Sequence, residues 1–226
     1  MYCLMDKELQ IGDQYKNNSL RNSLRERVVE TAFDAFVSQG IKCVTMDEIA
    51  NILGISKRTL YEVFADKETL LVDCILKFKK EADTYAKTIY DESTDVLEVL
   101  LKCYLYSIEK LHRTNKRFFD DLKKYPKAHE VLRKHQHQDN ENAVAFFTKG
   151  VEQGLFRNDV NFAIVNLLAH EQVNMLMNSE VFKAYPFLEV YESIMFTYIR
   201  GISTEKGIRR LDDFILEYRH LMQTDK

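Results

Sequence analysis

Residues that break regular structure are scarce in this sequence. Its 226 residues include only 7 glycines and 2 prolines. Because a fold with many turns draws heavily on these two residue types, their scarcity favours long helices over many short strands. With 46% hydrophobic residues, the chain is long and apolar enough to bury a core, as one domain or as two small ones.

An excess of positive charge is also absent. The formal net charge is −3 and the pI is about 6.1, so the chain as a whole has no basic field that would attract nucleic acid. Any nucleic-acid site must therefore depend on a local cluster of cations.

Neither a membrane span nor a secretory leader is predicted. No run of about 20 apolar residues occurs in the chain. The first residues, MYCLMDKELQIGDQ, lack the basic region and the long apolar stretch of a signal peptide. We therefore expect a cytoplasmic protein.

Cysteine and histidine form no recognisable metal or redox motif. The four cysteines are scattered along the chain, at Cys3, Cys43, Cys74 and Cys103. Without a CxxC pair, they are expected to be reduced structural thiols. His129, His135 and His137 form the one histidine cluster, but residues two apart on a helix point away from each other. Glycine-rich phosphate loops and the motifs of common hydrolases are missing as well. The sequence predicts no enzyme, no metal and no other cofactor.

Residues 24–40, LRERVVETAFDAFVSQG, have the spacing of an amphipathic helix. Leu24, Val28, Ala32 and Phe36 recur every four residues, which places them on one face. Gly40 follows at the position where a glycine commonly ends a helix.

The next stretch, TMDEIANILGISKRTLYEVFADKETLL (residues 45–71), predicts a second helix with a strong start signal. Thr45 followed by Glu48 is a capping box, and Val44 with Ile49 has the spacing of a hydrophobic staple. Gly54 is predicted to end this helix and to allow a sharp turn.

A third helix is predicted over 57–64, with Ser56 as its N-cap. Its tip carries Ser56, Lys57, Arg58 and Thr59. Two short helices joined by a glycine-containing turn, behind a first helix, describe a helix-turn-helix. In that motif the N-terminal end of the second helix enters the major groove of DNA. We therefore expect residues 56–61 to contact DNA.

A small helical bundle without DNA-binding function also fits these helices. Residues 21–67 contain seven basic and seven acidic residues, so local charge does not decide between the two interpretations. The placement of Lys57, Arg58 and Lys67 at helix N-termini favours DNA.

Residues 25–71 resemble the DNA-binding domain of the tetracycline-repressor (TetR) family of transcriptional regulators. The matching elements are T-x-x-x-I-A from Thr45 to Ala50 and G-I-S-x-x-T-L-Y-x-x-F-x-x-K-E-x-L from Gly54 to Leu70. The resemblance implies an all-α chain: an N-terminal three-helix head, a linker helix, and a helical body for ligand binding and dimerisation. It also implies a homodimer that binds double-stranded operator DNA.

The resemblance assigns DNA contacts by position. Lys57 and Arg58 would approach bases, whereas Thr45, Thr59, Tyr61 and Lys67 would hold phosphates, which position the protein rather than specify sequence. Two positions depart from the family. Val63 stands where an aromatic residue or histidine is usual. Glu62 stands where a neutral or basic group is common, and it would either pair with Arg58 at i,i+4 or accept from a cytosine amino group.

On this basis we expect the chain to divide into four segments: an N-terminal extension (1–20), the helix-turn-helix domain (21–66), the linker helix (67–92) and the ligand-binding and dimerisation domain (93–226). Helices are expected in the last segment over 95–113, 127–153, 161–178, 187–203 and 207–222. The turn GVEQGLFRNDV (150–160) also resembles the family. In the family, the two helices matching 161–178 and 187–203 form the dimer interface; their apolar stripes fit a monomer core equally well.

Candidates for a ligand site come from the aromatic residues of the body. Phe118–Phe119 and Phe146–Phe147 are adjacent pairs whose members cannot both face one core from one helix, so one of each would line a cavity between helices. The candidate ligand-binding residues are Tyr104, Phe118, Phe147 and His170, although such residues are more often core.

The sequence thus predicts a DNA-binding transcriptional regulator, a repressor released by an unknown small-molecule effector. The alternative is a TetR-like regulator or architectural DNA-binding protein that is controlled by a partner protein and binds no small molecule.

Overall fold

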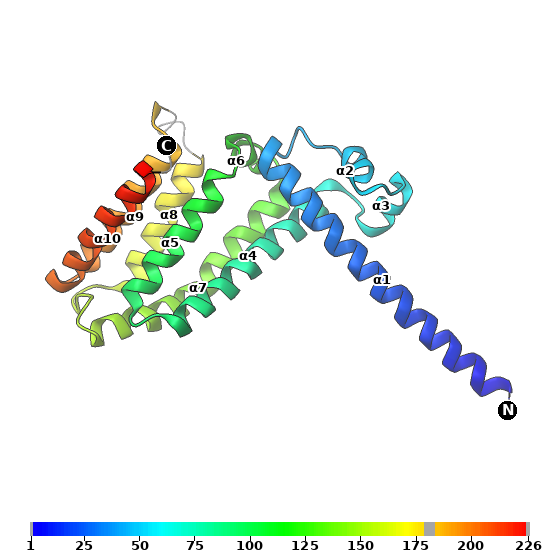
Figure 1. Cartoon of the computed structure of the whole chain (residues 1–226), viewed down its shortest axis with the longest axis horizontal. Coiled ribbons are helices and arrows are strands. Elements are labelled where there is room, and N and C mark those ends of the chain that lie inside the picture. The colour runs from blue at the N-terminus through cyan, green and yellow to red at the C-terminus, as the bar shows by residue number, and fades with distance from the viewer. Residues whose placement is uncertain (1, 179–183, 225–226) are drawn as a thin grey trace. The chain divides into compact units, whose positions relative to one another are not determined.

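The chain is all-α over the residues that its computed structural model describes, with backbone at 2–178 and 184–224 and side chains at 21–131, 142–172, 175 and 184–220. Figure 1 shows the helices in chain order: α1 (Tyr2–Gln39), α2 (Met46–Leu53), α3 (Lys57–Val63), α4 (Lys67–Glu92), α5 (Val96–His112), α6 (Lys116–Leu122), α7 (Pro126–Glu152), α8 (Phe162–Asn178), α9 (Phe187–Ile202) and α10 (Glu205–Thr224). Within these ranges, no helix combines the length and the apolarity needed to cross a lipid bilayer.

The helix bounds agree closely with those expected from the sequence, with one exception at the N-terminus. The helix predicted over 24–40 is the second half of α1, which begins at Tyr2. The first proline of the chain is Pro126, so no ring interrupts the hydrogen bonds of this longer helix.

The chain divides into two compact units, and the first is discontinuous in sequence. It comprises residues 1–79 together with 115–129, that is, α1–α3, the first half of α4, α6 and the first turn of α7. Its core contains Val28, Phe36, Ile49, Leu60 and Phe64, all of them buried. Helices α2, α3 and α6 each pack against α1.

The C-terminal end of α1 is held by residues from α6 and the turn that precedes it. The Asn115 backbone N–H donates to the carbonyl of Val37 at 2.8 Å, and its side-chain amide donates to the carbonyl of Ser38 at 3.1 Å. Helix α6 approaches the backbone closely at Gly40, where a Cβ atom would lie only 2.7 Å from the Cβ of Arg117. Gly40 also has a φ of 93°, which is unfavourable for other residues. Glycine at residue 40 therefore both ends α1 and admits α6.

The second unit comprises residues 80–114 and 130–226. Helix α9 lies against α5, α8 and α10. The core combines residues of α5 and α7–α10, and its buried members are Val96, Leu97, Leu101, Phe147, Leu155, Phe156, Phe162, Ile199, Ile202, Leu211 and Ile215. An isolated antiparallel bridge joins Phe156 to Ser203, which ties the turn after α7 to the end of α9.

Candidate nucleic-acid interface

The N-terminus of α2 has the capping box that the sequence predicts. The Thr45 hydroxyl accepts from the Glu48 backbone N–H at 3.2 Å, and the Glu48 carboxylate accepts from the Thr45 backbone N–H at 2.6 Å. The Thr45 hydroxyl also donates to this carboxylate at 2.9 Å, and the two hydrogen bonds that the carboxylate accepts from Thr45 hold the pKa of Glu48 below its ordinary value. Helix α2 ends at Gly54, whose φ of 66° is the left-handed conformation that glycine adopts most easily.

The N-terminus of α3 is capped by Ser56, also as predicted. Its hydroxyl accepts from the Thr59 backbone N–H at 3.0 Å and lies 2.8 Å from the Thr59 hydroxyl. Both hydroxyls at the tip of the helix are therefore engaged in the cap. The Lys57 and Arg58 side chains project outward from the same turn, with exposed fractions of 61% and 89%.

Each of these two cations is paired with an acid of the same unit. The Lys57 ammonium lies 2.9 Å from the Asp47 carboxylate on α2, which raises the pKa of Lys57. The Arg58 Nε lies 3.0 Å from the Glu62 carboxylate one turn along α3, which is the i,i+4 pair anticipated from the sequence. Exposed pairs of this kind are weak, so a phosphate or a base edge can replace the acid.

The remaining predicted contacts, Tyr61 and Lys67, differ in exposure. Tyr61 is exposed on α3. Lys67, at the start of α4, is partly buried, and its ammonium lies 5.7 Å from the centre of the Phe36 ring. Burial lowers the pKa of Lys67, while nearby Asp121 and Glu48 act in the opposite direction.

Two arginines of α1, which the sequence did not predict as part of this site, contact the other end of α3. Arg21 donates to the carbonyl of Glu62 at 2.8 Å, and Arg25 donates to that of Val63 at 3.2 Å. The partners are 41 and 38 residues apart in the chain, and no local motif signals contacts at such a distance.

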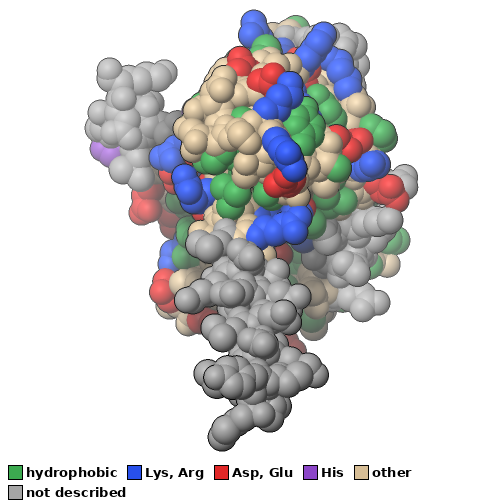
Figure 2. Space-filling view, turned by 90° about the vertical axis from the view of Figure 1, so that its right-hand side faces the viewer, with side chains coloured by type: hydrophobic (Ala, Val, Ile, Leu, Met, Phe, Trp, Pro, Cys, Tyr) green, Lys and Arg blue, Asp and Glu red, His purple; other side chains and the backbone are tan. Residues whose placement is uncertain are grey.

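Basic residues of α6 and its flanks add charge to the first unit. Residues 21–67 are neutral overall, whereas residues 115–129 contain five basic and two acidic residues. Figure 2 views the side of the molecule on which α2 and α3 lie; Lys and Arg side chains there are interspersed with Asp and Glu rather than gathered in one patch. A DNA interface on this unit would therefore depend on individual cations.

The four candidate ligand-binding residues have different surroundings. Phe118 is a buried residue of α6 in the first unit, in edge contact with Phe119. In the second unit, Phe147 stacks on Phe162 with ring centres 5.2 Å apart. Tyr104 lies among four aromatic rings of α9 and α10, namely Tyr191, Phe196, Phe214 and Tyr218. His170 is half-buried on α8. Phe147 and Tyr104 are thus surrounded by core side chains.

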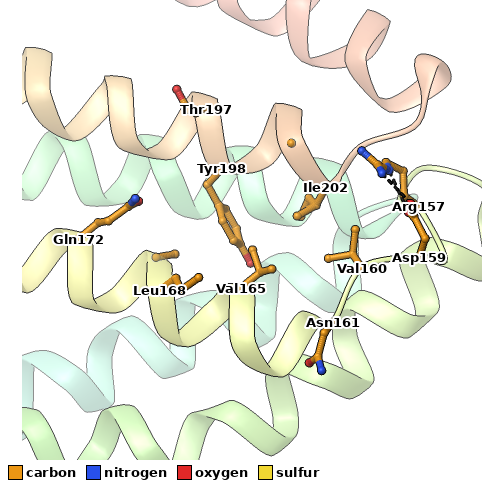
Figure 3. A pocket seen from close by; sticks show the side chains of 12 residues that line it. Arg157, Asp159, Val160, Asn161, Val165, Leu168, Gln172, Thr197, Tyr198 and Ile202 are labelled. Atoms are coloured by element: carbon orange, nitrogen blue, oxygen red, sulfur yellow. Dashed lines mark hydrogen bonds and ion pairs between the residues drawn. The ribbon is translucent and has the colours of Figure 1, made fainter.

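A cavity of about 470 Å³ lies elsewhere, between α8 and α9. Val165, Leu168 and Ala169 line it from α8, and Tyr198 and Ile202 from α9; Arg157 and Asp159 form an ion pair at its edge. Figure 3 shows the Tyr198 ring reaching from α9 towards Val165. The Tyr198 hydroxyl is buried without a hydrogen-bond partner, and burial raises the pKa of Tyr198. None of the four candidate ligand-binding residues lines this cavity.

Acidic, histidine and cysteine side chains within the described ranges form no cluster suited to a metal ion. Cys43, Cys74 and Cys103 are free thiols. The side chains of Cys3, His135 and His137 lie outside the ranges described.

Comparison with known proteins points to a single family. Residues 28–74 match the family described as bacterial regulatory proteins, tetR family. The chain is 26% identical over 150 residues to the HTH-type transcriptional repressor KstR2 of Mycobacterium tuberculosis, covering 64% of this chain and 74% of that protein. It is 30% identical over 101 residues to the uncharacterised HTH-type transcriptional regulator YvaF of Bacillus subtilis, covering 44% and 53%. A TetR-family regulator from Marinobacter aquaeolei has a similar structure, with a TM-score of 0.65, 17% identity, and 86% and 98% of the two chains covered.

Proposed function

Given that this chain is a helix-turn-helix transcriptional regulator of the tetR family, we propose that it represses transcription as a homodimer on an operator with two half-sites. The observation that carries the proposal is the exposed tip of α3, where Lys57 and Arg58 follow a capped N-terminus. The repressor name of its relative KstR2 supports the direction of regulation. The family consists of transcription factors rather than enzymes.

Side-chain chemistry suggests which residues would contact bases and which would contact phosphates. Arg58, whose planar guanidinium matches the O6 and N7 acceptors of guanine, would read bases together with Lys57. Thr45, Ser56, Thr59, Tyr61 and Lys67 would face phosphates. Because the hydroxyls of Thr45, Ser56 and Thr59 are engaged in caps, the free backbone N–H groups at these helix N-termini are the donors that we expect to meet phosphate.

Selection of bound fragments from a random duplex library would test sequence-specific binding. The expected result is an enriched pseudo-palindrome with half-sites about 34–36 Å apart, or a multiple of that distance. Arg58→Ala should weaken binding to this site by about 1–3 kcal/mol and relax one base preference. Lys67→Ala, the matched change at a phosphate contact, should weaken all sequences similarly. Equal losses on specific and random DNA for Arg58→Ala would contradict its role as a base reader.

The proposed dimer surface is the outer face of α8. Among the side chains of α8 that the structure describes, four large apolar ones are exposed, at Ile164, Leu167, Leu168 and Met175, beside the cavity between α8 and α9. Contiguous exposed apolar residues of this kind commonly mark an interaction surface. A second copy seated on this face would cover them and would bring two recognition helices into one assembly.

We further propose that a small-molecule effector releases the protein from operator DNA. The candidate contacts for this effector are Tyr104, Phe118, Phe147 and His170. Two segments support a mechanical route from the second unit to the first. Helix α4 begins at Lys67 and continues across the boundary between the units, and the chain returns to the first unit at 115–129. A ligand that alters either segment would change the position of the recognition helices.

The alternative is control by a partner protein without a small molecule, and the packing of Tyr104 and Phe147 in the core favours it. Calorimetry distinguishes the two. If an effector weakens operator affinity by a given factor, operator DNA must weaken effector affinity by the same factor. Equal effector affinity with and without operator would contradict the switch.

A further inference from the structure

Two arginines of α1 contact the end of α3 that lies opposite its proposed DNA-binding tip. Arg21 and Arg25 are one turn apart, and they donate to the carbonyls of Glu62 and Val63. These carbonyls belong to the last turn of α3, where a helix has no backbone donors left to satisfy them. Positive charge at a helix C-terminus also complements the helix dipole.

Arg25 makes two further contacts from the same guanidinium. Its Nη2 lies 2.5 Å from the Asp73 carboxylate of α4, and its Cζ lies 4.4 Å from the centre of the Phe64 ring. Phe64 is fully buried and is the C-cap residue of α3. One side chain therefore joins α1, the end of α3 and α4.

The length of α3 makes such an anchor important. The helix has seven residues, which span about 10 Å, and a helix this short is not stable by itself. Its C-terminal cap is extended backbone at Phe64 rather than a glycine in the left-handed conformation. The orientation of the tip therefore depends on packing through Leu60 and Phe64 and on the polar contacts made by Arg21 and Arg25.

We propose that Arg25, assisted by Arg21, is a positioning residue for sequence recognition: it fixes the direction of α3 so that Lys57 and Arg58 meet base edges in register. This inference rests on the proposed DNA-binding function. Base readout needs hydrogen bonds of narrow geometry, which weaken steeply when the donor is misaligned. Non-specific attraction to phosphates tolerates a tilted helix, because it depends on charge rather than on direction.

The test compares Arg25→Met in the full-length protein with the wild type on the selected operator and on random duplex. Methionine retains an apolar stem over Phe64 but removes the donors. The expected result is a fall of tenfold or more in the ratio of specific to non-specific affinity, with the salt dependence of non-specific binding unchanged. Arg25→Lys should not restore the ratio, because an ammonium cannot reach several acceptors in the fixed geometry of a guanidinium. Arg27→Met, an exposed arginine on another face of α1, is the matched control.

Two results would overturn the assignment. If the salt slope of non-specific binding falls by about 0.9 and all sequences weaken equally, Arg25 contacts a phosphate instead. An unchanged specificity ratio would mean that Arg25 does not position the recognition helix.

Amide hydrogen exchange provides a readout that is independent of DNA. Arg25→Met should accelerate exchange at the amides of residues 60–64 while leaving α2 (46–53) protected. Equal protection of α3 in the two proteins would contradict the anchor. If the wild-type protein selects no operator, the proposed function fails, whereas the exchange experiment still shows whether Arg25 holds α3.

Discussion

Among single residues, the acids beside the proposed recognition cations are expected to limit the affinity for DNA. Glu62 pairs with Arg58, and Asp47 pairs with Lys57. Each acid reduces the attraction of the tip for phosphates, and each pair must open when its cation contacts DNA. These ion pairs would therefore weaken binding to any duplex in which no phosphate or base acceptor is well placed to replace the acids beside Lys57 and Arg58.

Glu62→Gln should increase affinity for all duplexes several-fold and should lower the specificity ratio, because it removes a charge that repels phosphates and releases Arg58. Electrophoretic mobility shifts on operator and random DNA would measure both effects. Glu205→Gln, at the start of α10, makes the same change in net charge and should have little effect. A loss of affinity confined to sites with cytosine at one position would instead assign Glu62 to base reading.

Contacts between residues that are close in the chain could be predicted from the sequence. The caps at Thr45 and Ser56 are patterns that span four residues, and Gly54 fixes the turn by its own backbone preference, so each was predicted correctly. Contacts such as Arg25 with Asp73 depend on how helices cross. Periodicity identifies the buried face of α1 but not the helix that covers it.

At the level of elements, α6 is a structural part of the first unit. Asp121, which is only 6% exposed, accepts from the Lys42 backbone N–H at 2.8 Å and pairs with Lys124 at 3.0 Å. The order of helices along the chain did not predict this attachment, because it depends on a close approach at Gly40.

Asp121→Ala should lower the free energy of unfolding by about 1–3 kcal/mol, because it leaves a partly buried N–H without its acceptor. Urea denaturation followed by circular dichroism would measure the loss. Asp120→Ala changes the neighbouring exposed residue and should change stability by less than about 0.5 kcal/mol. Equal effects of the two substitutions would show that Asp121 contributes no more than surface charge.

The start of α4 makes stability depend on pH. The Asp66 carboxylate accepts from the Thr69 backbone N–H at 2.7 Å, which lowers the pKa of Asp66. Because the folded-state pKa is below the unfolded value of about 3.9, this contribution is complete above that value and is lost as the pH falls through the folded-state pKa.

Asp66→Asn should therefore leave stability at pH 7 nearly unchanged, since asparagine caps as well as aspartate. It should reduce the loss of stability as the pH falls below about 4. Unfolding in urea at several pH values would measure this, with Asp34→Asn in the interior of α1 as the control. A parallel pH dependence in wild type and Asp66→Asn would exclude Asp66 as a source of acid sensitivity.

For the whole molecule, the sequence left open whether the stripes of α8 and α9 form a monomer core or a dimer interface. The structure uses parts of both helices in the core: Phe162 is buried within it, as is Ile202, and Tyr198 packs against it. Ile164 and Leu168, by contrast, are 55% and 57% exposed. Amphipathic spacing alone cannot distinguish these roles, because both require apolar side chains.

The exposed residues of α8 make dimerisation testable without damage to the core. Leu168→Asp would place a charge in the proposed interface and should dissociate the dimer at micromolar concentration. Ala169→Asp, on the same helix, should also dissociate the dimer. Tyr198→Asp is a less specific test, because it would disturb the core of the second unit as well. Light scattering would measure the mass. Leu216→Asp on α10, where the leucine is 67% exposed, is the control, and a monomeric wild type would contradict the proposed dimer.

The split of the first unit between residues 1–79 and 115–129 affects how the protein is synthesised. A nascent chain that has emerged only as far as residue 79 lacks Asn115 and Asp121, which hold the end of α1 and the loop after it. At a translation rate of roughly 5–20 residues per second, the intervening segment takes about 2–7 s to appear. During that interval the end of α1 and the loop that leads into α2 lack part of their support, so the first unit would be completed on the ribosome only after part of the second unit has been made.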